Sequence, residues 1–330
     1  MYRFLSSTIL LFAMLSAKAQ YAPQTPLQGN TAIPQNDSRI VDWAATCSIE
    51  RGWLDIADTS LGHPTLGSES DAVGIPGSGV VSLGDSGVAV LTFNYHIYNG
   101  SGADFAVFEN GFSNPENDSF AYLELAFVEV SSDGIHYFRF PASSAMQDTV
   151  QIDNFTYSLA SKYHNLAGKY VSGYGTPFDL EDLKNIQGLD INNISHVRLV
   201  DVIGSINPLY ASMDKDNHII NEAYPSPYPS AGFDLNGVGV INSLKPTSVK
   251  ELNNSVSIKI YPNPTNDIVY IISENGNKVH YSLKDITGKE ICNGSFSGQT
   301  FLSLKERNKG FYFLYLEYGN EHFVQKIIKY

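Results

Sequence analysis

The chain has 330 residues, of which 43% are hydrophobic, and a formal net charge of −13 at pH 7. Residues 20–249 carry 9 Lys and Arg against 26 Asp and Glu, a net charge of −17, whereas residues 250–330 carry 10 against 8, a net of +2. Binding to nucleic acid or to an anionic membrane needs Lys and Arg to replace condensed counterions, so the acidic part argues against both partners. The length allows two domains. The change in charge separates a body over residues 40–243 from a C-terminal domain over residues 258–330, joined by a linker over residues 244–257.

Residues 1–19 have the features of a secretory signal peptide. Arg3 supplies a positive charge, an apolar run follows, and Ala17-Lys18-Ala19 matches the small-residue cleavage pattern. The apolar run is much shorter than the roughly 20 residues that span a bilayer, so a membrane anchor is the weaker alternative. We predict cleavage before Gln20, an extended leader over residues 20–39, and no transmembrane segment in the mature chain.

Strands are predicted throughout the body. Phe105 to Glu109 alternates with the period of a strand, and this segment is too hydrophobic for the surface. The apolar segment from Phe120 to Val130 leads into Asp133-Gly134, a pair that favours a tight hairpin turn in which both central residues have positive φ. The predicted class is therefore all-β, with the body a jelly-roll-like sandwich of two packed sheets.

One helix is expected in the body, beginning at Thr176. Threonine can cap a helix, Pro177 suits the first helical position, and Asp179 stands where a capping-box acid belongs. The apolar residues between Leu180 and Ile186 would then form one buried face.

Acidic residues of the body are candidates for a structural calcium site. Several lie on or beside predicted core strands, where a charge must be paired, hydrogen-bonded or bound to metal. The segment from Asp214 to Glu222 alternates oxygen side chains as calcium loops do, and calcium accepts several oxygen ligands in flexible geometry. A solvated acidic turn with hydrogen-bonded carboxylates is the alternative. The predicted ligands are Asp104, Glu109, Asp201, Asp214, Asp216, Glu222 and Asp234.

No catalytic residues are predicted. Gly84 to Gly87 reads G-D-S-G, as in the nucleophile loop of chymotrypsin-like proteases, but only His63 precedes it, so we interpret it as a turn between strands. The histidines show no zinc-binding spacing. Cys47 and Cys292 are predicted to be buried free thiols, one in each domain.

Two resemblances concern the body. The segment from Val128 to Phe138, V-E-V-S-S-D-G-I-H-Y-F, resembles the strand-turn-strand of discoidin-like (galactose-binding-like, jelly-roll) domains. Over about residues 40–242, motifs that include G-A-D-F-A-V-F-E-N-G-F and S-A-G-F-D-L-N-G-V-G-V-I look like an uncharacterised family of exported bacterial surface proteins. The second resemblance implies export and brings no established activity.

Four spaced motifs mark residues 258–330, with period-two strands between them. The prolines and glycines of these motifs set the turns of a small antiparallel, immunoglobulin-like sandwich. In this order the motifs resemble the type A C-terminal sorting domain of the type IX secretion system of Bacteroidetes. The motif residues are Tyr261, Pro262, Asn263, Pro264, Asp285, Gly288, Lys289, Gly310, Tyr312 and Lys326.

The sorting resemblance implies export through the periplasm to the cell surface or the medium, with the type IX machinery as a partner. Two functions remain open for the body. One is a non-catalytic binding module for a glycan or another small-molecule nutrient, and the other is a secreted hydrolase of polysaccharide or another extracellular polymer. Close carboxylates in a cleft would favour the hydrolase, and an aromatic-lined face at the sandwich loops would favour binding.

Overall fold

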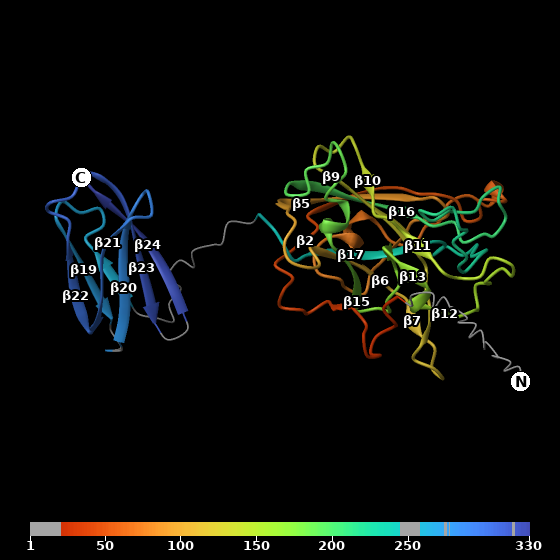
Figure 1. Ribbon diagram of the computed structural model, residues 1–330, viewed down its shortest axis with the longest axis horizontal. Coiled ribbons are helices and arrows are strands. Elements are labelled where there is room, and N and C mark those ends of the chain that lie inside the picture. The colour runs from red at the N-terminus through yellow and green to blue at the C-terminus, as the bar shows by residue number, and fades with distance from the viewer. Residues whose placement is uncertain (1–20, 245–257, 274–275, 277, 319–320) are drawn as a thin grey trace, which may run out of the picture. The chain divides into compact units, whose positions relative to one another are not determined.

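The computed structural model describes residues 21–244, 258–273, 276, 278–318 and 321–330. The chain divides into two compact units, Met1–Lys245 and Pro246–Tyr330, and the division falls in the segment predicted as a linker (Figure 1). The predicted signal peptide lies outside the described residues, as does nearly all of the linker.

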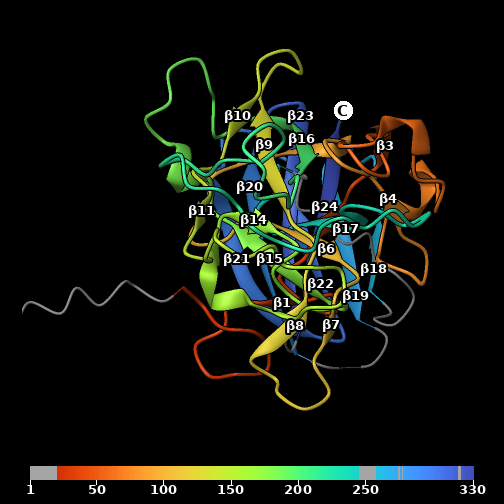
Figure 2. The ribbon, with the colours of Figure 1, turned by 90° about the vertical axis from the view of Figure 1, so that its right-hand side faces the viewer.

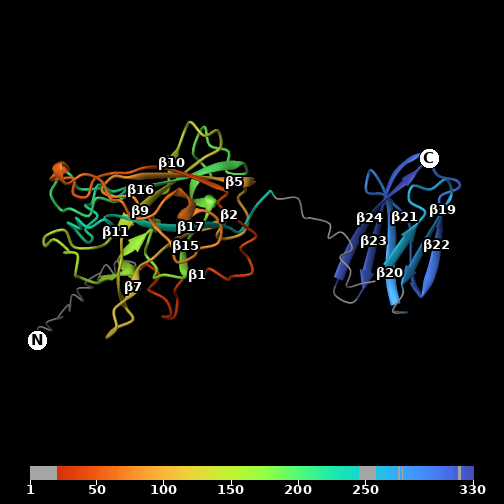
Figure 3. The same ribbon diagram turned by 180° about the vertical axis from the view of Figure 1, so that it is seen from behind.

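Two large antiparallel sheets form the body, and in Figures 1 and 3 they lie one above the other. The lower one, the β6 sheet, has the order β1 (Ile33–Pro34), β15 (Tyr174–Phe178), β6 (Phe105–Glu109), β17 (Asp234–Val240) and β2 (Asp42–Trp43), with β4 (Val81–Ser82) paired to β17. The upper one, the β16 sheet, has the order β10 (Phe138–Arg139), β9 (Ala126–Ser131), β16 (Ile194–Asp201), β5 (Val88–Ile97) and β3 (Thr46–Glu50), with β14 (Leu166–Ala167) paired to β9.

Short elements complete the body at the ends of these sheets. Two small sheets pair β11 (Ser143–Ser144) with β13 (Tyr163–His164), and β8 (Phe120–Tyr122) with both β7 (Phe112–Ser113) and β12 (Ser158–Leu159). The hairpin of β7 and β8 lies at the lower edge of the body in Figure 2. The helical elements are single 3₁₀ turns, η1 (Thr59–Leu61), η2 (Glu69–Ala72), η3 (Ala160–Lys162) and η4 (Leu180–Leu183).

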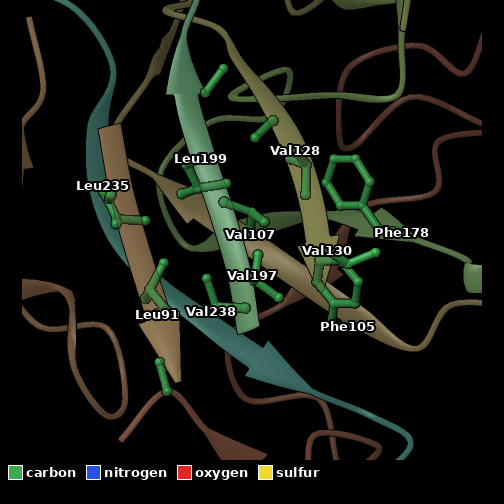
Figure 4. Packing of buried hydrophobic residues seen from close by; sticks show 14 of the residues in the cluster. Leu91, Phe105, Val107, Val128, Val130, Phe178, Val197, Leu199, Leu235 and Val238 are labelled. Carbon is green, nitrogen blue, oxygen red and sulfur yellow. The ribbon is translucent and has the colours of Figure 1, made fainter. Parts of the chain in front are cut away.

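The hydrophobic core lies between the two large sheets (Figure 4). Side chains alternate along β16, so that Val197 and Leu199 point into the core while Arg198 does not. All residues of β6 are buried, because its second face is covered as well. There Ala106 and Phe108 pack with Ile33 of the predicted leader, which pairs with the body through β1. The all-β class is confirmed as two packed sheets, and the jelly-roll classification stays a prediction.

The predicted helix is wrong in type and in starting point. Thr176 and Phe178 belong to β15, and Asp179 is the N-cap of the short turn η4, accepting a hydrogen bond from the Glu181 N–H at 2.9 Å. Thr176 pairs with Val107 of β6, and the Phe178 ring is buried in the core. Sheet pairing and burial therefore outweigh local capping preferences here.

The predicted Asp133-Gly134 hairpin exists, but the tight two-residue turn is wrong. Val130 of β9 pairs with Phe138 of β10, so residues 132–137 form a wider loop in which Gly134 has φ +76° and Asp133 has no positive φ. The Asp133 carboxylate accepts hydrogen bonds from the N–H groups of Ile135 and His136, both at 2.8 Å. This side-chain bridge closes the wider loop.

The C-terminal unit is a separate small sandwich. One sheet has the order β18 (Ile258–Tyr261), β19 (Ile268–Ser273) and β22 (Gln299–Ser303), and the other has the order β21 (Glu290–Ser297), β20 (Lys278–Asp285), β23 (Gly310–Tyr318) and β24 (Glu321–Lys329). Its core is its own, built from residues that include Val269, Leu283 and Leu314.

Several motif residues of this unit have visible structural roles. The Asn263 side chain donates to the Lys326 carbonyl of β24 at 2.6 Å and accepts from the Ile328 N–H at 2.9 Å. Asp285 accepts from the Lys289 N–H at 3.1 Å in a turn where Gly288 has φ +81°. These motif residues therefore hold turns in place by hydrogen bonds to neighbouring strands and turns.

Candidate functional site

Six carboxylic acids gather inside the body where strands of both sheets end. Glu109 ends β6, Asp234 begins β17 and Asp201 ends β16. Register brings Glu109 and Asp234 to the same end of the β6 sheet, and the six acids are close enough that, besides burial, neighbouring carboxylates help to raise the pKa of Glu109, Glu124, Asp201 and Glu222. The acidic cluster consists of Asp85, Glu109, Glu124, Asp201, Glu222 and Asp234, each less than a tenth exposed.

Three members of the acidic cluster bind backbone groups of loops. Asp201 uses both oxygens, accepting from the Phe233 N–H at 2.7 Å and from the Ser86 N–H at 3.0 Å. Glu222 accepts from the Leu125 N–H and Asp85 from the Ile56 N–H, each at 2.7 Å. These carboxylates fix the chain around the strand ends.

Of the other three members, Asp234 uses both oxygens, accepting from the Ser82 hydroxyl through Oδ1 and, at 3.0 Å, from the Asn110 amide through Oδ2. The remaining two members are less completely bonded. Glu109 accepts from the Gly111 N–H at 2.7 Å through Oε2, while its buried Oε1 has no partner. Glu124 is 7% exposed, and its carboxylate meets no hydrogen-bond donor in the part of the chain that the structure describes.

No member of the acidic cluster forms an ion pair with Lys or Arg of the described residues. Burial raises the pKa of Asp85 to about 7 and that of Asp234 to about 6. Burial first, and the neighbouring carboxylates second, also raise the pKa of Glu109 and Glu124 well above the ordinary value. Buried negative charge of this kind must take up protons or a cation.

A pocket of about 210 Å³ lies over two members of the acidic cluster. Glu124 and Asp234 line it together with residues of the β7–β8 hairpin and of the loop over residues 225–230. Its rim is aromatic: Phe112 is 53% exposed and stacks on Tyr122 with ring centroids 5.1 Å apart, and Tyr228 is 52% exposed. The remaining lining residues are Asn110, Ser226 and Ser230.

Two larger pockets, of about 690 and 680 Å³, lie on either side of Tyr21. The Tyr21 ring stacks on His164, which lines both of them. The first contains a buried lysine, Lys169, whose pKa burial lowers to about 8 and whose ammonium group donates to the Tyr163 carbonyl at 2.9 Å. Among the described residues that line these two pockets, the buried polar atom without a hydrogen-bond partner is Thr176 Oγ1, in the first.

The predicted metal ligands do not all meet. Asp104 lies outside the acidic cluster, and both of its oxygens accept hydrogen bonds, at 2.7 Å, from the N–H groups of Gly100 and Leu180 and from the Asn242 amide. Asp214 and Asp216 form a separate group with His218. The structure therefore brings together four of the predicted ligands, which are Glu109, Asp201, Glu222 and Asp234.

Sequence reasoning missed two members of the acidic cluster, Asp85 and Glu124. Glu124 interrupts the apolar run F-A-Y-L-E-L-A-F, and this is the same signal, a charge within a buried strand segment, that identified Glu109. Asp85 was considered only as a neighbour of Ser86 in the protease-like G-D-S-G segment.

The residues weighed for catalysis or redox chemistry have structural explanations. Ser86 lies in a turn with φ +65°. The His63 Nδ1 atom lies 2.6 Å from the Gly52 carbonyl oxygen, and the His63 ring stacks on the ring of Trp53. Cys47 and Cys292 are free, as predicted, but they are half-buried rather than fully buried. Burial raises the pKa of Cys47 to about 12, which makes it a poor nucleophile.

The separate C-terminal sandwich and its motifs define an exported protein with a sorting tail. Residues 259–330 match the secretion system C-terminal sorting domain family. The C-terminal unit is thus a type IX sorting domain, and the protein is exported to the cell surface or the extracellular space, with the secretion machinery as a partner of the tail. Within the described residues, no helix has the length and apolar character to cross a membrane.

Solved structures give only a remote likeness for the chain. The β-glucuronidase of Ruminococcus gnavus with C6-substituted uronic isofagomine is 10% identical, with a TM-score of 0.23, over 94% of this chain and 47% of that one. The Lactobacillus rhamnosus β-glucuronidase is 12% identical, with a TM-score of 0.23, over 93% and 46%. The chain spans about half the length of these structures. No curated protein matches it in sequence. A likeness at this level supports no conclusion about activity.

Proposed function

We propose that the body is a non-catalytic glycan-binding module that the sorting tail brings to the cell exterior. The observation that carries this proposal is the pocket in which the exposed rings of Phe112 and Tyr228 surround a polar floor. Aromatic faces pack on the apolar faces of sugar rings, while amide, hydroxyl and carboxylate groups bind sugar hydroxyls. Asn110, Ser226 and Asp234 supply such groups.

The size and charge of the pocket narrow the ligand class. Its volume of about 210 Å³ is below the ~300–1,000 Å³ of typical small-molecule sites. It therefore accommodates one sugar unit, with the rest of the glycan lying across the surface. The described residues that line the pocket include no Lys or Arg to bind a carboxylated or sulfated sugar, so we expect a neutral glycan.

A glycan array with the chain over residues 20–330 tests this proposal. We expect binding to neutral glycans. Phe112→Ala and Tyr228→Ala should each lower the affinity about 3–10-fold, as expected for the loss of one aromatic contact. Phe155→Ala is the matched control, since Phe155 is 77% exposed and lies outside the pocket. Equal binding by the wild type and a Phe112→Ala/Tyr228→Ala double variant would refute the proposal.

The hydrolase is the second candidate, because one pocket holds two carboxyl groups with raised pKa values, Glu124 and Asp234. Glycoside hydrolysis uses a protonated acid beside an ionised carboxylate. Release of reducing ends from the glycans bound on the array separates the two functions. We expect none, whereas release that Glu124→Gln abolishes would establish a hydrolase.

A further inference from the structure

The acidic cluster contains more negative charge than its hydrogen bonds stabilise. Asp201 uses both of its oxygens, but Glu109 Oε1 and the whole Glu124 carboxylate are without donors among the described residues. Glu109 is 1% exposed and its Oε1 is fully buried, while Glu124 is 7% exposed and lines the pocket. An unpaired buried carboxylate costs several kcal/mol, which a bound cation would offset.

We propose that Glu109, Glu124 and Asp234 bind one calcium ion at the floor of the pocket. Glu124 and Asp234 line the pocket, and the Glu109 carboxylate lies close to its wall, since a Cβ atom at Gly111 would lie 3.0 Å from Glu109 Oε2 and 2.8 Å from the carbonyl of Tyr122, another lining residue. Asn110, whose amide group donates to Asp234, is at the same place and carries a neutral oxygen. This inference stands independently of glycan binding.

The ligand chemistry selects calcium among the common cations. The three side chains are carboxylates, two at strand ends and Glu124 in the segment between β8 and β9, without a histidine or cysteine among them, so they suit a hard cation with flexible geometry rather than zinc. Magnesium demands a near-ideal octahedron and keeps several waters, which a small, mostly buried pocket does not favour.

Binding requires a local movement that the hydrogen bonds permit. Among the described residues, the one trio of such groups whose ligand atoms all lie within 4.8 Å of one another is Asp214, Asp216 and His218. The acidic cluster is therefore more open than a closed metal site, as mutual repulsion requires in the absence of a cation. Glu124 can rotate toward Asp234 without breaking a hydrogen bond, because its carboxylate has none.

The Asp214 group is not the better site. Both Asp214 oxygens accept backbone hydrogen bonds, from the N–H groups of Ser144, Asp216 and His218 at 2.8–3.0 Å. Asp216 is exposed and pairs with Lys215 at 2.6 Å. The group is a closed polar turn, and it supplies the control for the experiment.

Calcium titration of the chain over residues 20–330 by isothermal calorimetry tests the proposal. We expect one calcium ion per chain, and a Kd that Glu124→Gln raises at least about tenfold, since ligand charge sets calcium affinity. Asp216→Asn should leave the Kd unchanged. The absence of binding heat, or loss of binding in Asp216→Asn with normal binding in Glu124→Gln, would overturn the proposal.

Melting curves provide a second readout that does not depend on the variant binding calcium. In chelator, Glu124→Gln should melt at a higher temperature than the wild type, because it removes a buried charge without removing a hydrogen bond. With calcium present, the difference between the two melting temperatures should become smaller or change sign, since calcium stabilises only the protein that binds it. A wild type with the same melting temperature in calcium and in chelator would show that the carboxylates are neutralised by protons alone.

Discussion

Single carboxylates in this body perform two different tasks. Asp201 joins three segments by accepting from the N–H groups of Phe233 and Ser86, and Asp104 does the same for Gly100 and Leu180. Such buried carboxylates are structural, because a backbone N–H group binds each oxygen. Glu124 is the opposite case, and its missing donor is what distinguishes a candidate ligand from a structural acid.

The raised pKa of Asp85 predicts a pH dependence of stability. Its ordinary pKa is 3.8 and burial raises it to about 7. Between these values the folded protein holds a proton that the unfolded chain has released, so the free energy of unfolding falls as pH rises from 4 to 7. The full shift is worth about 4 kcal/mol at most. In chelator, we expect the body to melt at a higher temperature at pH 5 than at pH 7.5.

Asp85→Asn keeps an acceptor for the Ile56 N–H and should reduce this pH dependence, whereas Asp118→Asn, which alters an exposed carboxylate, should not. Melting curves at several pH values decide the matter. A wild type that becomes more stable between pH 5 and pH 7.5 would contradict the assignment.

At the scale of elements, period and turn chemistry predicted much of the fold. The alternation of Phe105 to Glu109 and the position of the Asp133-Gly134 loop were both readable, because they depend on neighbouring residues. The strand over Thr176 to Phe178 was not readable from the sequence, because it forms by pairing with β6, a segment far away in the sequence. Glu124 and Asp85 lie in segments between strands, and what brings these segments to the acidic cluster is the packing of elements that are distant in the sequence.

Gly134 gives a test of the β9–β10 loop. It has φ +76°, and a Cβ atom there would lie 2.8 Å from the His196 ring. Valine should therefore destabilise the body by about 1–3 kcal/mol, through left-handed strain and contact with that ring. Chemical denaturation measures the change.

Gly77→Val is the matched control, because Gly77 is exposed, has no positive φ, and a Cβ atom there would meet nothing within 4 Å. If Gly134→Val and Gly77→Val are equally stable, the conformation of the β9–β10 loop does not contribute to the stability of the fold.

At the scale of the whole molecule, the two units have separate cores. The hydrophobic clusters of the body contain no residue of the C-terminal unit, and the cluster around Leu283 contains none of the body. Deleting residues 246–330 should therefore leave a folded body with an unchanged melting temperature but without its sorting signal, and so confined to the periplasm.

Cell fractionation in a host with a type IX system measures this outcome, with the full chain as the control. Arrival of the truncated protein at the surface or in the medium would contradict the role of the tail. An insoluble product would contradict the independence of the two cores.

The position of β17 has a consequence for how the protein is made. β17 is the last strand of the body along the chain, yet it lies between β6 and β2 inside its sheet. The ribosome must therefore produce almost the entire body before β6, which β15 pairs on one side, gains its second neighbour. Until then one edge of a buried and mostly apolar strand stays open, which invites aggregation, and pairings between distant segments form slowly. Any chain terminated before Asp234 lacks the strand that closes this edge, so nascent-chain length itself decides whether the body can fold.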